Sequence, residues 1–280
     1  MKNLAVRTLT GAVYVLLLIG CTVWSPVASF LFFSLLTVAV LAEFAVLVNS
    51  RTEARINIPI NSLAGFLLVS AVWLSCVGSP DAHKCFALYG ALLLYIMVSE
   101  LYRNAKSPLQ DWALAFASQI YIAVPFSMLP LLCIMVDESS GSMQYQWVYV
   151  LALFVFLWTN DTGAYLVGCG LSRYFPAKLF PRISPKKSWV GSVGGCLLTL
   201  LASIVVCRCF PGSLSLGKWM GYAMVVVVFG TWGDLVESLL KRQLGVKDSG
   251  NILPGHGGLL DRLDSALLAI PAVVLYNVAF

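Results

Sequence analysis

Long apolar stretches alternate with short polar segments along the whole chain. An apolar stretch of about 20 residues spans the hydrocarbon core of a bilayer as a helix. The pattern therefore predicts an all-α, polytopic integral membrane protein with about nine transmembrane helices, although several stretches are so short or close together that eight or ten also fit. The nine stretches lie at about Leu9–Trp24, Val27–Val48, Ile58–Val77, Cys85–Leu101, Trp112–Val136, Trp147–Gly168, Val190–Phe210, Lys218–Leu240 and Leu263–Phe280.

Composition supports the membrane assignment. The 280 residues are 59% hydrophobic and only 11% charged, whereas a soluble domain carries about 25% charged residues. Lys2 and Arg7 before an apolar run also resemble a signal peptide, but a further apolar stretch follows almost at once. The first stretch is therefore predicted to be a retained span.

Basic residues predict the orientation, because Lys and Arg accumulate in cytoplasmic loops. With nine spans and the N-terminus inside, only Lys84, Arg208 and Lys218 fall outside. We therefore expect a multi-pass protein of the inner (cell) membrane with its N-terminus in and its C-terminus out. The remaining basic residues fall inside: Lys2, Arg7, Arg51, Arg55, Arg103, Lys106, Arg173, Lys178, Arg182, Lys186, Lys187, Lys241, Arg242, Lys247 and Arg262.

The polar residues are unevenly distributed along the chain. The densest polar segment, residues 238–264, lies between two apolar stretches. Ionisable residues at membrane depth are costly and usually functional, so a site is expected there.

Carboxylates near this segment predict a metal site. Asp234 and Ser238 fall on one face of a helix, as do Asp261 and Asp264. Three converging carboxylates, Asp234, Asp261 and Asp264, suit Mg²⁺, which prefers oxygen ligands. An ion-pair lattice, for example Asp261 with Lys241, is the alternative.

A glycine-rich segment precedes the last apolar stretch. Glycines permit positive φ and close backbone approach, and amides at a helix start bind anions. Phosphate binding is therefore predicted around His256, Gly257 and Gly258, although a plain turn is also compatible. Four cations lie near this segment in the sequence, namely Lys241, Arg242, Lys247 and Arg262.

Two further polar segments are predicted on the same side. Asp161 interrupts an apolar stretch and is expected to face a polar interior. Lys186 and Lys187 could bind phosphate or anchor the loop at anionic headgroups. Gly191 and Gly195 have the spacing that allows membrane helices to pack closely, and we interpret them as structural.

Residues 238–264 resemble the signature of the phosphatidate cytidylyltransferases, also called CDP-diacylglycerol synthases. The blocks Asn160–Tyr165 and Ser184–Trp189 are similar to further family segments. The clear resemblance runs from about Trp158 to the C-terminus, and the first half resembles the family only as a polytopic apolar region. The resemblance therefore implies that residues 1–145 form a transmembrane scaffold with lipid-side walls and that residues 146–280 form the catalytic region. The signature positions that match are Ser238, Lys241, Arg242, Lys247, Asp248, Pro254, His256, Gly257, Gly258, Asp261, Arg262 and Asp264.

The resemblance implies that CTP and phosphatidate give CDP-diacylglycerol and pyrophosphate with Mg²⁺, in phospholipid biosynthesis. It implies catalytic roles for Lys241, Asp261 and Asp264. Expected partners are CTP, phosphatidate and membrane lipids, without nucleic acid; a homodimer and a second, monovalent or divalent, cation are left open. The implied substrate-binding residues are Asp161, Ser184, Lys186, Lys187, Ser188, Ser238, Arg242, Lys247, His256, Gly257, Gly258 and Arg262.

Two other functions fit parts of the pattern. A membrane nucleotidyltransferase acting on a different lipid phosphate would use the same metal and phosphate chemistry. A secondary transporter would use intramembrane carboxylates for ions, but its charges would lie nearer the middle of several spans. The concentration of charge at helix ends therefore favours an enzyme.

Overall fold

The computed structural model describes residues 2–136, 143–252 and 257–280. The chain divides into two compact units. The first contains residues 1–147 and 243–263, and the second contains residues 148–242 and 264–280. Most of residues 238–264 are therefore grouped with the N-terminal residues, and residues 238–242 are grouped with the second unit. The roles expected for residues 1–145 and 146–280 stay predictions.

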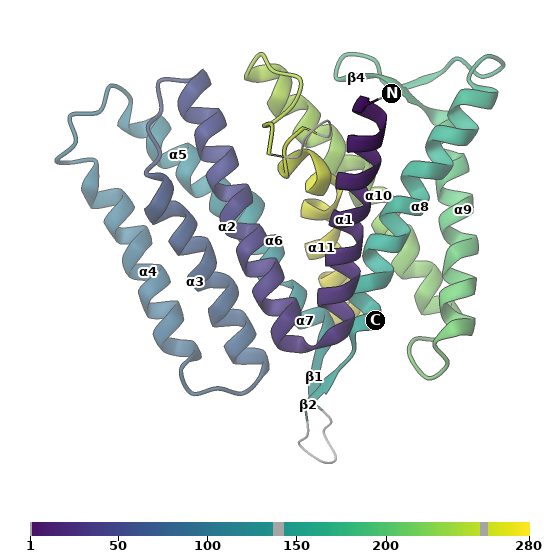
Figure 1. Ribbon diagram of the computed structural model, residues 1–280, viewed down its shortest axis with the longest axis horizontal. Coiled ribbons are helices and arrows are strands. Elements are labelled where there is room, and N and C mark those ends of the chain that lie inside the picture. Colours follow the sequence, from purple (N-terminus) through teal and green to yellow (C-terminus); the bar gives the residue numbers. More distant parts are fainter. Residues whose placement is uncertain (1, 137–142, 253–256) are drawn as a thin grey trace. The chain divides into compact units, whose positions relative to one another are not determined.

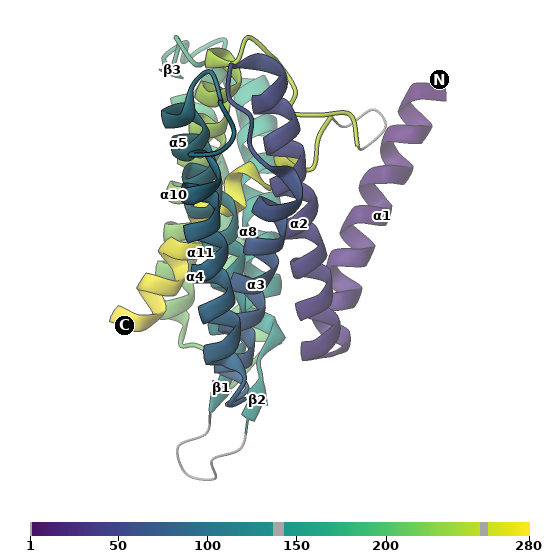
Figure 2. The same ribbon diagram turned by 90° about the vertical axis from the view of Figure 1, so that its left-hand side faces the viewer.

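The first unit is built from long helices and a short hairpin (Figure 1). Ser25 caps the second helix by accepting a hydrogen bond from the Ala28 amide, and Asn57 caps the third through the Ile60 amide. The first two helices meet at their junction and diverge toward the N-terminus (Figure 2). The elements are α1 Lys2–Trp24, α2 Pro26–Arg51, α3 Ile58–Cys76, α4 Ala82–Ser99, α5 Pro108–Ser118, η1 Gln119–Ala123, α6 Val124–Ser127, α7 Leu129–Cys133, β1 Ile134–Val136 and β2 Met143–Tyr145.

The span between Pro108 and Cys133 is an interrupted helix. Its middle is the π-helical turn η1, and Pro125 and Pro130 lie in the short helices that follow. Proline removes a backbone donor, so breaks at such positions are expected. The Gln119 side chain donates to the Asn61 carbonyl oxygen at 2.8 Å. This buried hydrogen bond ties the interrupted span to α3.

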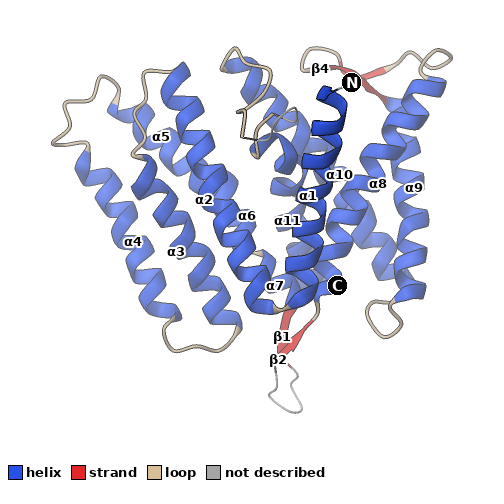
Figure 3. Ribbon diagram, in the orientation of Figure 1, coloured by secondary structure: helices blue, strands red, loops and turns tan. Residues whose placement is uncertain are grey.

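The second unit contains four long helices and a hairpin, whose strands are red in Figure 3. Lys178 pairs with Ser188 and Phe180 with Ser184, where the sequence predicted only a loop. The apolar core includes Tyr222, whose hydroxyl donates to the Tyr149 carbonyl oxygen at 2.7 Å. The elements are α8 Trp147–Leu171, β3 Lys178–Phe180, β4 Ser184–Ser188, α9 Trp189–Cys209, α10 Leu216–Gln243 and α11 Leu260–Ala279.

Small residues bring α8 and α9 together, as the sequence predicted for Gly191 and Gly195. A Cβ at Gly195 would lie 2.6 Å from the Asn160 carbonyl oxygen, and one at Gly191 would lie 2.8 Å from that of Ala164. Backbone cannot move aside as a flexible side chain can, so glycine is required for this approach.

Eight helical segments among the described residues are long and apolar enough to cross a membrane. The apolar part of α1, Thr8–Trp24, is shorter. The all-α polytopic fold is therefore confirmed, and the number of spans agrees with the predicted range of eight to ten. The eight segments are Pro26–Arg51, Ile58–Cys76, Ala82–Ser99, Pro108–Cys133, Trp147–Leu171, Trp189–Cys209, Leu216–Gln243 and Leu260–Ala279.

Candidate functional site

A cavity of about 610 Å³ lies in the second unit, lined by parts of α8, the β3–β4 hairpin, α9 and α10. Its lining combines two acidic side chains with lysines, in a unit otherwise rich in apolar helices. The structure thus brings together residues from three separate polar segments of the sequence. Five predicted site residues line it, namely Asp161, Lys186, Lys187, Ser188 and Asp234.

An ion pair in this cavity joins the hairpin to α10. Lys187 Nζ lies 2.7 Å from Asp234 Oδ2, and both side chains are partly buried. The same ammonium donates to the Thr231 carbonyl oxygen at 3.3 Å. The Ser238 hydroxyl, one turn further along α10, donates to Asp234 Oδ1 at 3.1 Å, as the i, i+4 spacing predicted.

Ser188 places the lysine-bearing strand against α9. It is the N-cap residue, and its hydroxyl oxygen accepts a hydrogen bond from the Gly191 amide at 3.2 Å. The Ser172 hydroxyl donates to it at 3.0 Å. Ser184 pairs with Phe180 at the other end of the same strand. The strand's two ends are therefore fixed on either side of Lys186 and Lys187.

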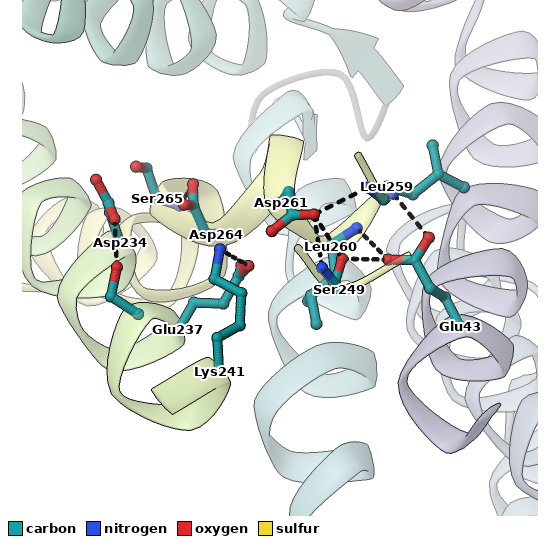
Figure 4. Close-up of polar contacts among 12 residues, drawn as sticks. Glu43, Asp234, Glu237, Lys241, Ser249, Leu259, Leu260, Asp261, Asp264 and Ser265 are labelled. Carbon is teal, nitrogen blue, oxygen red and sulfur yellow. Dashed lines mark hydrogen bonds and ion pairs between the residues drawn. The ribbon is translucent and has the colours of Figure 1, made fainter. Parts of the chain in front are cut away.

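A second carboxylate lies close to Asp234 because α10 and α11 approach through a glycine. A Cβ at Gly233 would lie 2.5 Å from the Asp264 carbonyl oxygen. The negative charges of Asp234 and Asp161 both act on the Asp264 carboxylate, and so does the positive charge of Lys241. Figure 4 shows the side chains of Asp234, Lys241 and Asp264. Asp264 Oδ1 accepts a hydrogen bond from the Ser265 amide at 2.6 Å. Asp161, Asp234 and Asp264 all belong to the second unit.

Lys241 has a structural partner of its own. Its ammonium lies 2.9 Å from the carboxylate of Glu237, a residue with 0% relative exposure. Removing one partner of a buried ion pair leaves an uncompensated charge. A substitution of Lys241 therefore changes stability as well as any role in catalysis, and its predicted catalytic role stays a prediction.

Asp261 organises the signature loop, which we define as residues 244–252 and 257–259, within the first unit. Its Oδ2 accepts hydrogen bonds from the Ser249 amide at 2.8 Å, the Ser249 hydroxyl at 2.9 Å and the Gly258 amide at 2.9 Å. Gly257 has φ of +84°, so the positive φ expected from a glycine here is confirmed. Asp261 therefore has a clear role in shaping this loop.

Three of the cations predicted to bind phosphate lie at the protein surface. Arg242, Lys247 and Arg262 are exposed, so a soluble anion could reach them. His256 lies outside the described residues. Their assignments to substrate stay predictions.

The model of the cytidylyltransferase family matches residues 5–280 of the chain. The chain belongs to this family. A phosphatidate cytidylyltransferase of Staphylococcus haemolyticus is 32% identical over 272 residues, covering 95% of this chain and 96% of that protein. Proteins of the same name are 32% identical in Staphylococcus saprophyticus and 29% identical in Staphylococcus aureus, with the same coverage.

Membership of the cytidylyltransferase family confirms the resemblance and extends it over the first half of the chain. Among the described residues no cluster of three or more His, Cys, Asp or Glu side chains has the geometry to hold a metal ion. Mg²⁺, however, is usually bound by one or two carboxylates together with substrate phosphates. Asp234 and Asp264, two carboxylates of the second unit, make a donor set of that size. Metal binding by this pair, or by the three-residue set with Asp261, stays a prediction.

Two buried polar residues of this cytidylyltransferase were not among the predicted site residues. Asn160 lines the cavity, and its Oδ1 has no hydrogen-bond partner among the described residues. Glu43, on α2, accepts hydrogen bonds from the signature loop. A lone carboxylate inside the Val27–Val48 stretch is the kind of intramembrane charge that usually marks a function, so the signal for Glu43 was present in the sequence.

Proposed function

We propose that the chain transfers CMP from CTP to phosphatidate, giving CDP-diacylglycerol and pyrophosphate at a membrane. The observation that carries the proposal is the cavity in the second unit, where Lys186 and Lys187 lie with Asp161 and Asp234 in a chain of the cytidylyltransferase family. Cations and carboxylates side by side suit a reaction between two phosphate anions with a metal ion.

The chemistry is one displacement at phosphorus. A phosphate oxygen of phosphatidate attacks the α-phosphorus of CTP, and the new O–P bond forms as the bond to the bridging oxygen of the pyrophosphate breaks. The nucleophile is already an anion, so the reaction needs no strong base. The barrier comes from repulsion between the two anions and from charge on the leaving pyrophosphate, which makes positioning and charge neutralisation the main tasks of the protein.

The residues of the cavity match these tasks. Lys186 and Lys187 supply positive charge for phosphate oxygens. Asp234 and Asp264 would hold Mg²⁺, with Asp161 nearby. When bound, Mg²⁺ supplies charge neutralisation at the phosphates. Lys187 forms an ion pair with Asp234, which lowers the net negative charge that an anionic substrate would meet there. A second cation and a homodimer stay predictions.

The enzyme is expected to face the cytoplasm from the inner membrane. Cysteines introduced singly in a cysteine-free protein test this orientation. Arg182→Cys, in the turn of the β3–β4 hairpin, should react with a membrane-impermeant maleimide only after cells are opened. Pro211→Cys, in the loop between α9 and α10, should react in intact cells. The reverse pattern would contradict the orientation.

Pyrophosphate release from CTP tests the function. Purified protein in detergent should release pyrophosphate only when phosphatidate and Mg²⁺ are both present, and EDTA should abolish the release. Consumption of CTP with another lipid phosphate but not with phosphatidate would assign a different lipid substrate. No nucleotide consumption with any lipid would favour a transporter.

A further inference from the structure

Glu43 is a buried carboxylate in α2, far in sequence from the signature region. Its relative exposure is 6%, and an ionised group with so little water needs hydrogen-bond donors. The signature loop and the start of α11 supply three: the Ser249 hydroxyl at 2.6 Å, the Leu259 amide at 2.8 Å and the Leu260 amide at 3.1 Å (Figure 4). All of these residues belong to the first unit.

The loop backbone is shaped around this carboxylate. A Cβ at Gly250 would lie 2.9 Å from Glu43 Cδ, and one at Gly258 would overlap both Glu43 Oε1 and Ser249 Oγ. A larger residue at either loop position would therefore displace the Glu43 carboxylate from its hydrogen-bond donors.

Glu43 also accepts hydrogen bonds from the backbone amides at the start of α11. The first amides of a helix have no partner within the helix, and the sequence predicted that a substrate phosphate would bind near them. In the structure the Leu259 and Leu260 amides donate to Glu43, and the Gly258 amide donates to Asp261. The anion at this helix start is thus a side chain of α2.

Ser249 links Glu43 to Asp261. Its hydroxyl oxygen lies 2.6 Å from Glu43 Oε1 and 2.9 Å from Asp261 Oδ2, so the two carboxylates share its single proton. The Ser249 amide donates to the same Asp261 oxygen. A displacement of Ser249 therefore moves the donors that hold the Asp261 carboxylate.

We propose that Glu43 is a positioning residue of the cytidylyltransferase reaction: it fixes the signature loop and the start of α11, and it holds Asp261 through Ser249. The catalytic part of this proposal rests on the proposed function. It gives the N-terminal unit a part in the reaction beyond that of a scaffold, because the side chain that fixes the loop comes from α2.

Glu43→Gln tests the proposal with little change in volume. The amide oxygen retains the contacts of Oε1, but the amide nitrogen would face the Leu259 N–H, donor against donor. We expect deuterium exchange of the backbone amides in the signature loop and first turn of α11 to accelerate about 10-fold. We expect kcat to fall about 10- to 100-fold, since small misplacements have effects of this size, while KM for CTP changes less than about 3-fold, as expected when positioning is lost but binding is kept. Glu53→Gln, an exposed carboxylate of the same unit, is the matched control and should leave exchange and turnover unchanged.

Ser249→Ala gives an independent test that removes only a hydroxyl, and it decides the matter if Glu43→Gln does not fold. The two substitutions should be non-additive, because both break the same linkage. Wild-type exchange and kcat in either single variant, or additive effects in the double variant, would overturn the proposal. If wild-type protein does not consume CTP, the proposed function fails; the exchange data then decide separately whether Glu43 holds the loop.

Discussion

Asp264→Asn is expected to lower turnover by at least about 10²-fold, or roughly 2.7 kcal/mol in the barrier. The change removes a negative charge with little change in volume. Asp264 lies in the electrostatic field of Asp234 and Asp161, and carboxylates are the protein ligands that Mg²⁺ uses together with phosphates. Asp234→Asn should behave in the same way, because both side chains are proposed to hold one ion.

Two measurements separate loss of metal from loss of folding. Mn²⁺ binding, followed by electron paramagnetic resonance, should weaken in both variants, while thermal unfolding in detergent should stay close to that of the wild type. Asp81→Asn provides the control. Asp81 is exposed, and its carboxylate forms a surface ion pair with the exposed Lys84. Turnover and Mn²⁺ binding near wild-type values in both Asp234→Asn and Asp264→Asn would show that these residues do not hold the metal.

Lys187→Met is expected to have the next largest effect, a loss of about 10²-fold in kcat/KM for CTP. The ammonium lies in the cavity beside Asp234, and charged donors to phosphate oxygens are among the strongest hydrogen bonds in proteins. Its removal takes away one of the two cations proposed to contact the phosphates and leaves Asp234 without its 2.7 Å partner. Steady-state kinetics with varied CTP measure the loss.

Lys106→Met is the matched control for Lys187→Met. Lys106 lies with Arg55 and Arg103 at a separate cavity of the first unit, outside the proposed site, so its removal should change kcat/KM less than about 2-fold. Lys187→Arg should recover part of the activity because it retains the charge. If kcat/KM for CTP falls equally little in Lys187→Met and Lys106→Met, the cavity does not bind the nucleotide phosphates as proposed.

Local relations within one helix could be predicted from the sequence. The i, i+4 spacing placed Ser238 beside Asp234, and the structure shows a hydrogen bond between them. The Gly191/Gly195 spacing also predicted a closely packed helix face, and the structure identifies α8 as its partner. Such relations follow from helical geometry alone.

Relations between distant segments could not be predicted in this way. The approach of α10 to α11 depends on Gly233 facing the backbone of Asp264, and no periodic pattern identifies which glycine makes such a contact. The hydrogen bond from Ser249 to Glu43 spans 206 positions of sequence. The β3–β4 hairpin was missed because strands of three and five residues are too short to show an alternating pattern.

The most direct test of the central claim is the fate of each phosphorus of CTP. Purified protein is incubated with Mg²⁺, phosphatidate and CTP labelled at either the α- or the γ-phosphorus. The proposed displacement predicts that the α-label appears in a lipid that carries CMP and that the γ-label appears only in pyrophosphate. Transfer of the γ-label to lipid, or recovery of both labels in intact CTP, would contradict the assignment.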